Sequence, residues 1–366
     1  MSGIAGILNR DGAPVDPHLI SRLTGFLSFR GPDAQQFRIV GNVGLGHASF
    51  CATVEAATEQ QPLTLDQKLW LTADVRLDAR RELIGKLEDK LGAPLRTLDN
   101  SRRAPNDAEL ILHAYEAWAD DCVKYLLGDF AFAIWDGGKQ RYFCARDHFG
   151  VKPFYFAEMP RGFAFSNTLN SLRTQPYVSS TLNEMAVADF LLFGINQDTA
   201  TTIFADIKRL PPAHLLTVDE RGLQIRRYWS VPTDGCIRYR RSRDYVDRFV
   251  ELLHTAVKDR VRSTRVSVWM SGGVDSTSIT AVARQVLSTR GTPFDLRAHT
   301  IVYDTLIPDQ ERHYAQLAAS AVGVDTRVFA ADSYQPFEGW SAAGPIVPEP
   351  TGDPFIRMRV RQLSEV

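Results

Sequence analysis

The sequence predicts two domains of different class: an α+β sandwich over residues 1–229, followed by an α/β domain built on a parallel sheet over residues 230–366. Three observations lead to this prediction. The 366 residues suffice for two ordinary domains, and 44% of them are hydrophobic, which is enough for two separate cores. Short apolar runs set off by Gly, Asp and Asn fill the first part. Strand-like and helix-like segments alternate in the second part.

The first part consists mainly of predicted strands with helices between them. Six runs have the length and composition of strands: GIAGIL, VGLGHASF, LWLTADV, FAFAIWD, RYFCAR and FAFSN. Residues 107–118 are predicted to form a helix, because Leu110, Ile111, Ala114 and Trp118 recur at three- and four-residue spacing behind the start signal APND. Antiparallel sheets flanked by helices make an α+β sandwich.

A polar stretch after Trp229 separates the two parts and precedes a long predicted helix. We expect this helix to begin at Ser242 and to bury an apolar stripe at helical spacing, namely Tyr245, Phe249, Leu252, Leu253, Ala256 and Val257. The strands 265–270, 296–303 and 325–329 then alternate with helices over 276–287 and 310–322, the order of an open parallel sheet. Three clear strands are fewer than the five or six of a complete doubly wound domain, and the segment 339–355 is rich in Pro and Gly. We therefore expect the second domain to be incomplete.

Composition argues against several classes of protein. Lys plus Arg at 42 nearly cancels Asp plus Glu at 43, so no global field favours nucleic acid or anionic lipid. The four cysteines form no C-x-x-C pair, which argues against a structural zinc site or a disulfide framework. The first residues lack the pattern of a secretory signal, and no run of about 18 apolar residues occurs. We expect a cytoplasmic protein without nucleic-acid or membrane partners.

The segment RVSVWMSGGVDSTSITAV, residues 265–282, has the pattern of a phosphate-binding turn. An apolar strand leads into Ser271, Gly272 and Gly273, and a predicted helix follows. Two glycines permit torsions that point several N–H groups at one anion, and the helix N-terminus and nearby hydroxyls add further positive charge and donors. Phosphate would repel the carboxylate of Asp275 unless a divalent cation lay between them, so we expect Mg²⁺. A simpler alternative is a tight strand-to-helix turn with Asp275 as a helix cap.

This turn and other motifs resemble a known family. SGGVDST resembles the PP-loop of the ATP-pyrophosphatase superfamily, whose members cleave ATP to AMP and pyrophosphate. Upstream, MSGIAGI, RGPD, GH, QPL, LLGDFAFAIWD, ARDHFGVKPFYF and RLPPAH occur in the order typical of glutamine-dependent asparagine synthetases. The resemblance covers essentially the whole chain. It implies an N-terminal nucleophile (Ntn) amidotransferase domain, a four-layer sandwich, followed by a PP-loop ATP-pyrophosphatase domain.

The resemblance also implies site residues in the second domain. The residues that would bind ATP are Met270, Ser271, Gly272, Gly273, Asp275, Ser276 and Val302, with Met270 and Val302 at the adenine. Asp275 and Asp309 would bind Mg²⁺. For Asp309, the position before a helix in IPDQER is explained equally well by a helix cap, and both roles are compatible.

The sequence departs from the family at its glutaminase site. The family's second residue is a cysteine whose thiolate attacks glutamine, and here it is Ser2. The family arginine that grips the glutamine carboxylate corresponds to Ser49, and the family NGE, with its oxyanion hole, corresponds to Thr72–Asp74. Asp107, which matches an acid that contacts the glutamine amine, is kept. These changes argue against glutamine hydrolysis; a Ser2 hydroxyl activated by the α-amine is the alternative nucleophile.

Loss of the glutaminase implies another amine donor. This set of losses, together with DHFGVKPFYF, FSNTLN and LIPDQE, resembles the macrolactam synthetases that cyclise lasso peptides. Such an enzyme would activate an Asp or Glu side chain of a precursor peptide with ATP and Mg²⁺ and join it to the peptide's own N-terminal amine, with a protease or leader-binding protein as a further partner. Two alternatives stay open: an asparagine synthetase that uses aspartate with ammonia or glutamine, and a noncatalytic truncated fragment.

Overall fold

The computed structural model describes residues 1–53, 56, 59–99, 101, 103–307, 309–333, 335, 349 and 350. Most of the Pro- and Gly-rich segment 339–355 lies outside these residues. The chain folds into two compact units, unit 1 over Met1–Thr233 and unit 2, which begins at Asp234. Each unit is described by itself.

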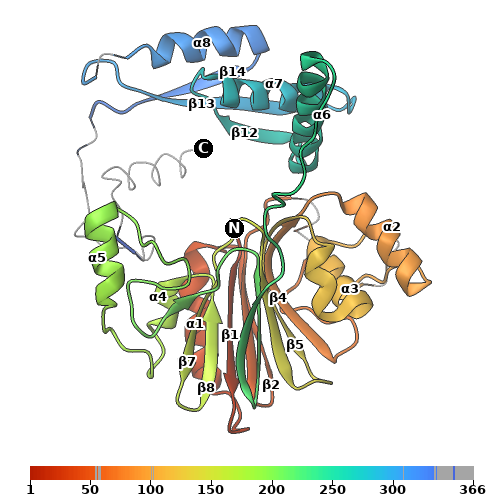
Figure 1. The fold of residues 1–366 in the computed structure, drawn as a ribbon, viewed down its shortest axis with the longest axis vertical. Coiled ribbons are helices and arrows are strands. Elements are labelled where there is room, and N and C mark those ends of the chain that lie inside the picture. The colour runs from red at the N-terminus through yellow and green to blue at the C-terminus, as the bar shows by residue number, and fades with distance from the viewer. Residues whose placement is uncertain are drawn as a thin grey trace. The chain divides into compact units, whose positions relative to one another are not determined.

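Two antiparallel sheets form the centre of unit 1 (Figure 1). The first has the strand order β2-β3-β1-β8-β7-β9 and the second the order β11-β10-β6-β5-β4. The strands of the first sheet are β1 (Gly3–Asn9), β2 (Ala34–Val40), β3 (Val43–Ser49), β7 (Tyr155–Met159), β8 (Gly162–Ser166) and β9 (Lys208–Arg209). Those of the second are β4 (Leu69–Leu77), β5 (Gly128–Asp136), β6 (Arg141–Arg146), β10 (His214–Asp219) and β11 (Gly222–Arg227).

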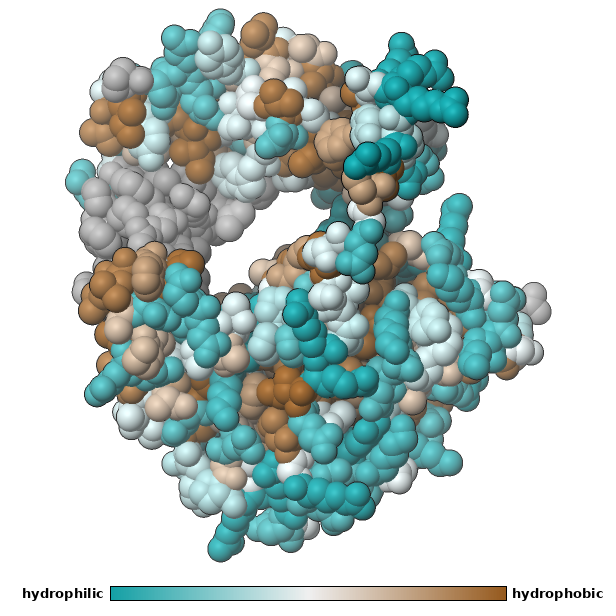
Figure 2. Space-filling model, viewed as in Figure 1, coloured by the Kyte–Doolittle hydropathy of each residue, from teal (hydrophilic) through white to brown (hydrophobic). Residues whose placement is uncertain are grey.

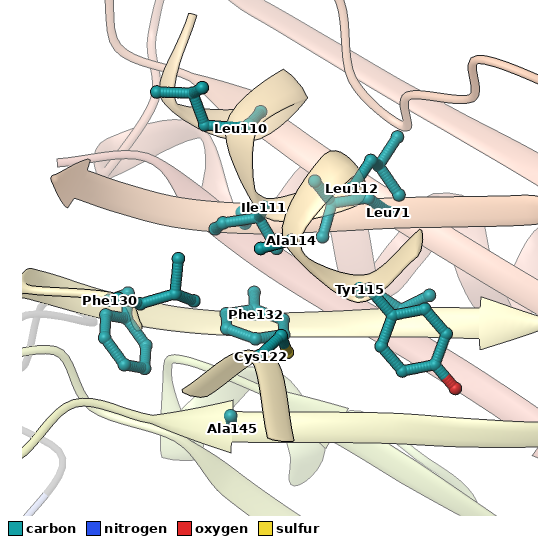
Figure 3. Packing of buried hydrophobic residues seen from close by; sticks show 14 of the residues in the cluster. Leu71, Leu110, Ile111, Leu112, Ala114, Tyr115, Cys122, Phe130, Phe132 and Ala145 are labelled. Carbon is teal, nitrogen blue, oxygen red and sulfur yellow. The ribbon is translucent and has the colours of Figure 1, made fainter. Parts of the chain in front are cut away.

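Helices cover the outer face of each sheet, which gives four layers. Helices α1 (Pro17–Phe26) and α4 (Leu169–Leu172) pack on the first sheet, and α3 (Asp107–Trp118) packs on the second beside α2 (Arg80–Leu91). One apolar cluster lies between the sheets and one lies between each sheet and its helices. Figure 3 shows the cluster beneath α3, where Ile111 and Ala114 lie above Phe132 of β5. The predicted α+β sandwich is confirmed.

Helix α3 has the predicted bounds because its start is specified locally. The Asn106 side chain accepts a hydrogen bond from the Glu109 N–H at 2.8 Å, and the Glu109 carboxylate accepts one from the Asn106 N–H at 2.8 Å. This reciprocal capping box satisfies two N–H groups that the first helical turn leaves free. The apolar residues that follow then face the second sheet.

Unit 2 contains three parallel strands in the order β12-β13-β14. In chain order its elements are α6 (Ser242–Arg260), β12 (Arg265–Trp269), α7 (Val274–Ser288), β13 (Asp295–Val302), α8 (Glu311–Val322) and β14 (Asp325–Ala330). The core lies between the strands and the helices, with Leu296 and Ala298 of β13 buried in it. The predicted alternation of strands and helices is confirmed.

The predicted burial of the α6 stripe is wrong. Helix α6 begins at Ser242 as expected, but the side chains of Tyr245, Phe249 and Leu252 are 45%, 65% and 51% exposed, and Ala256 is exposed as well. Val257 is buried, and Leu253 is partly buried against the same cluster. The reason is that α6 joins the core through its C-terminal half, beside α7, whereas its N-terminal half lies outside that apolar cluster, with the Tyr245 ring packed only edge-on against Tyr239 among the described residues.

Helix α5 (Glu184–Phe193) also presents apolar side chains to solvent. Leu191, Leu192 and Phe193 are each more than 60% exposed, and Figure 2 shows the hydrophobic surface over this helix. Among the described residues, no helix is both long enough and apolar enough to cross a bilayer.

Candidate functional site

The glycine turn between β12 and α7 has a backbone geometry that requires glycine. Gly272 has a φ of +79°, in the left-handed region that other residues avoid. A Cβ at this position would lie 2.5 Å from the carbonyl carbon of Tyr314 and 2.7 Å from the nitrogen of Ala315. Gly272 therefore allows the turn to approach the backbone of α8 closely. The side chain of any larger residue would clash with the α8 backbone.

Hydroxyl groups and the start of α7 surround this turn. The Ser276 hydroxyl accepts a hydrogen bond from the Ser271 N–H at 3.2 Å and lies 3.4 Å from the Ser271 hydroxyl. The Gly273 N–H donates to the Ser271 hydroxyl at 3.4 Å. Asp275 stands in the first turn of α7 with an exposed side chain. The structure thus brings the predicted phosphate-binding residues together at the carboxyl end of a parallel strand, the usual position of ligands in open α/β sheets.

Met270 and Val302, the residues expected at the adenine, lie at the carboxyl ends of neighbouring strands. Their side chains are 1% and 0% exposed, so both belong to the core of unit 2. The Met270 N–H donates to the carbonyl of His299 at 2.9 Å, and the Met270 carbonyl accepts from the Thr300 hydroxyl at 2.5 Å. These bonds hold the strand that leads into the turn.

Asp309 lies one residue before Gln310, which is the N-cap residue of α8. Its carboxylate accepts a hydrogen bond from the Glu311 N–H at 3.1 Å, while its side chain stays exposed. Within the described part of the chain, no three His, Cys, Asp or Glu side chains gather as a metal site. Mg²⁺ is often held by one or two carboxylates together with substrate phosphates, so Asp275 and Asp309 are a suitable donor set beside a bound nucleotide.

Ser2 lies in a second candidate site, directly before β1. The Ser2 hydroxyl accepts a hydrogen bond from the Phe50 N–H at 3.2 Å. The Ser2 carbonyl accepts from the Asn167 amide at 2.8 Å and from the Arg30 guanidinium at 3.4 Å. Burial lowers the pKa of the Met1 ammonium to about 6, against the opposing charge of Asp74.

The Asp74 carboxylate is paired within the protein. It is 3% exposed and accepts a hydrogen bond from the Lys152 ammonium at 2.8 Å, with Arg30 and Asn167 at 3.5 Å from its second oxygen. Sequence reasoning missed these partners, although Lys152 stands inside the quoted motif ARDHFGVKPFYF. Only the fold brings Lys152 to a strand 78 residues away.

Asp107 and Thr72 are also engaged by the protein's own groups. Asp107 accepts a hydrogen bond from the Leu77 N–H at 2.9 Å and forms an ion pair with Arg80 at 3.0 Å. The Thr72 hydroxyl donates to the Gly46 carbonyl at 2.9 Å. The two acids that would face a substrate amine, Asp74 and Asp107, thus already face cationic side chains of the chain itself.

His47 lies buried beside this site. Burial lowers its pKa from the usual 6.5 to about 4, and the nearby Asp74 carboxylate and Ala73 carbonyl only partly oppose this effect. The imidazole is therefore neutral at physiological pH. A neutral, buried ring beside a paired carboxylate suits a structural role better than proton transfer to a substrate.

Comparisons with known families match both parts of the chain. Residues 1–229 match the family model described as a glutamine amidotransferase domain, and residues 248–355 match the one described as asparagine synthase.

Curated relatives align with most of this chain. The chain is 31% identical over 289 residues to asparagine synthetase [glutamine-hydrolyzing] 3 of Bacillus subtilis, covering 77% of this chain and 45% of that one. It is 28% identical over 338 residues to asparagine synthetase [glutamine-hydrolyzing] 2 of the same organism, covering 87% and 42%. It is 25% identical over 356 residues to the amidase chry2 of Gibberella zeae, covering 89% and 49%. The chain spans less than half the length of these relatives.

Proposed function

Because this chain belongs to the asparagine synthetase family, we propose that it acts in forming an amide bond at the expense of ATP. A carboxylate would attack the α-phosphate of ATP, release pyrophosphate and become an acyl-adenylate. An amine would then displace AMP. The observation that carries this proposal is the glycine turn at residues 271–273, placed between a parallel strand and a helix N-terminus.

The residues of unit 2 have distinct roles in this mechanism. N–H groups of the turn, the hydroxyls of Ser271 and Ser276 and the N-terminus of α7 would bind the triphosphate and stabilise charge on the departing pyrophosphate. The strand ends at Met270 and Val302 would border the adenine. Asp275 and Asp309 would hold Mg²⁺, which neutralises phosphate charge when bound.

Nucleotide binding is tested with Asp275→Ala. We expect this variant to lose Mg²⁺-ATP binding in titration calorimetry while its circular dichroism is unchanged, because the remaining phosphate site would lack a metal ligand. Asp325→Ala, at another exposed aspartate of unit 2, is the matched control. Equal affinity of Asp275→Ala and the wild type would remove the turn from the mechanism.

The amine donor in this proposal is not glutamine. Substituting the arginine that grips the glutamine carboxylate removes a charge-assisted contact of about 1.5–3 kcal/mol. Substituting an oxyanion donor costs roughly 2.7–4 kcal/mol of transition-state stabilisation. Two ion pairs within the protein support the same conclusion: Asp74 is paired with Lys152, and Asp107 is paired with Arg80. A substrate ammonium would have to displace one of these cations.

The purified chain should therefore release no glutamate from glutamine. Ser2→Cys restores the family's nucleophile but should not restore glutaminase activity. In this variant Asp74 is still paired with Lys152, and Asp107 with Arg80. Substantial glutamate release by the wild type would contradict the proposal. Release by Ser2→Cys alone would show that the pocket is intact and only the thiol is missing.

We propose further that the substrate is a precursor peptide, whose Asp or Glu side chain is joined to its own N-terminal amine. The support is the resemblance of the motifs to lasso-peptide macrolactam synthetases, together with the altered glutaminase site. A precursor-peptide gene and a cysteine-protease gene beside this one would favour it. The decisive assay is AMP formation coupled to the loss of one water from the peptide by mass spectrometry.

A second candidate is asparagine synthesis, which the names of the Bacillus subtilis relatives favour. AMP formation that depends on aspartate and ammonium, with no peptide present, would support this candidate over the first. Intact nucleotide binding without AMP formation from either substrate pair would point to a noncatalytic role.

A further inference from the structure

The loop that follows β13 is bound by a single carboxylate from the end of β14. Asp332 accepts hydrogen bonds from the backbone N–H groups of Asp304, Thr305 and Leu306 at 2.8, 2.7 and 2.7 Å. It also accepts one from the Thr305 hydroxyl at 2.9 Å. Three backbone donors on one carboxylate hold the pKa of Asp332 well below its usual range. The loop and the end of β14 are thus one connected piece.

A second contact ties the same loop to helix α8. The Asp304 carboxylate pairs with the Arg312 guanidinium through two hydrogen bonds, at 2.8 Å from Nε and 2.6 Å from Nη2. Arg312 stands in the first turn of α8. Two parallel bonds between planar groups fix orientation as well as distance. This ion pair therefore joins the loop to the N-terminal turn of α8.

The backbone of helix α8 in turn packs against the glycine turn. The close approach to Gly272 is made by the backbone at Tyr314 and Ala315, two and three residues after Arg312. Asp309 lies in sequence between the bound loop and the helix, and its carboxylate accepts a hydrogen bond from the N–H of Glu311, the first residue of α8. A continuous series of contacts thus runs from Asp332 through the loop and α8 to the turn that carries Ser271 and Asp275.

From these contacts we infer that Asp332 and Arg312 are positioning residues, which hold Asp309 and the start of α8 against the glycine turn so that a nucleotide triphosphate and its divalent cation are bound together. This inference rests on the proposed function, since it concerns the same ATP site. In this inference Asp332 and Arg312, which lie outside the SGGVDST motif, set the distance between the carboxylates of Asp275 and Asp309. Neither residue need contact the nucleotide.

The test compares two nucleotides by titration calorimetry. AMP lacks the β- and γ-phosphates, so its binding should depend little on the placement of Asp309. For Asp332→Asn we expect about a tenfold rise in the Kd of Mg²⁺-ATP and less than about a twofold change in the Kd of AMP. Arg312→Gln, which leaves Asp332 in place, should give the same selective loss. Asp325→Asn, at the other end of β14, is the control and should bind both nucleotides like the wild type.

A double variant separates positioning from simple destabilisation. If Asp332 acts through Asp309, then Asp309→Asn with Asp332→Asn should bind Mg²⁺-ATP no more weakly than Asp309→Asn alone. Additive losses, or equal losses for AMP and Mg²⁺-ATP, would overturn the positioning role. So would wild-type affinities in both Asp332→Asn and Arg312→Gln. A wild-type chain that binds neither nucleotide would overturn the proposed function itself, together with this inference.

Discussion

At the scale of single residues, the acid beside Ser2 is neutralised by a side chain of the protein, whereas a substrate pocket would leave it to bind the substrate. Asp74 and Lys152 are both nearly buried and lie 2.8 Å apart. A buried pair contributes little compared with two apolar residues, but removal of one partner leaves an uncompensated charge. Substitution of Lys152 should therefore lower the free energy of unfolding of unit 1.

Lys152→Met should lower the free energy of unfolding of unit 1 by about 3 kcal/mol, because Asp74 would keep only its longer contacts to Arg30 and Asn167. Urea unfolding followed by tryptophan fluorescence provides the measurement. The double variant Lys152→Met with Asp74→Asn should recover part of this loss. A single variant as stable as the wild type would show that the pair is not buried in solution.

His47 should make the stability of unit 1 depend on pH. Its pKa is about 4 in the folded chain against 6.5 unfolded, so the unfolded state takes up a proton first as the pH falls. The contribution is complete above pH 6.5 and is lost between pH 6.5 and about 4, by on the order of 3 kcal/mol. In His47→Asn the urea midpoint of unit 1 should depend less on pH between pH 6.5 and about 4. An unchanged slope in the variant would exclude His47 as the titrating group.

At the scale of elements, the β12–turn–α7 segment is the unit on which nucleotide binding depends. Its geometry combines a positive φ at Gly272, which is strained for other residues, with a close backbone contact to α8 that leaves no room for a Cβ. The strand and the helix can form from their own residues, whereas the turn between them also depends on α8.

Gly272→Ala should therefore weaken Mg²⁺-ATP binding more than tenfold, since the added methyl group must push α8 away from the turn. Calorimetric titration against the wild type is the measurement. Gly291→Ala, at a glycine with positive φ but open surroundings in the same unit, controls for backbone strain alone. Equal binding by both variants would show that the close approach to α8 is unimportant.

At the scale of the whole molecule, the two units have separate cores, so ligand linkage should be confined to one of them. A ligand stabilises only the unit that binds it in the folded state, by RT ln(1 + [L]/Kd). In calorimetric unfolding we expect Mg²⁺-ATP at 100 times its Kd to stabilise unit 2 by about 2.7 kcal/mol and to leave the transition of unit 1 in place. With Asp275→Ala neither transition should move. A shift of both transitions in the wild type would mean that the units unfold together.

Much of the fold follows from local pattern. The capping box at Asn106 and Glu109 and the spacing of apolar residues behind it specify α3, and the alternation of β12, α7, β13, α8 and β14 is visible as a change of hydrophobic period. The α6 stripe shows the limit of such reasoning. Periodicity identifies which face of a helix is apolar, but whether that face is covered depends on elements elsewhere in the chain.

The sequence by itself determined the two-part organisation, the bounds of the main helices and the position of the glycine turn, because capping, periodicity and backbone freedom act between residues a few positions apart. Only the tertiary structure decided that Lys152 neutralises Asp74, that Arg80 pairs with Asp107, and that Asp332 and Arg312 connect the β13 loop to the turn. These contacts join residues from 8 to 78 positions apart in the chain. A charge selects its partner by distance in space, which no local pattern of residue types specifies.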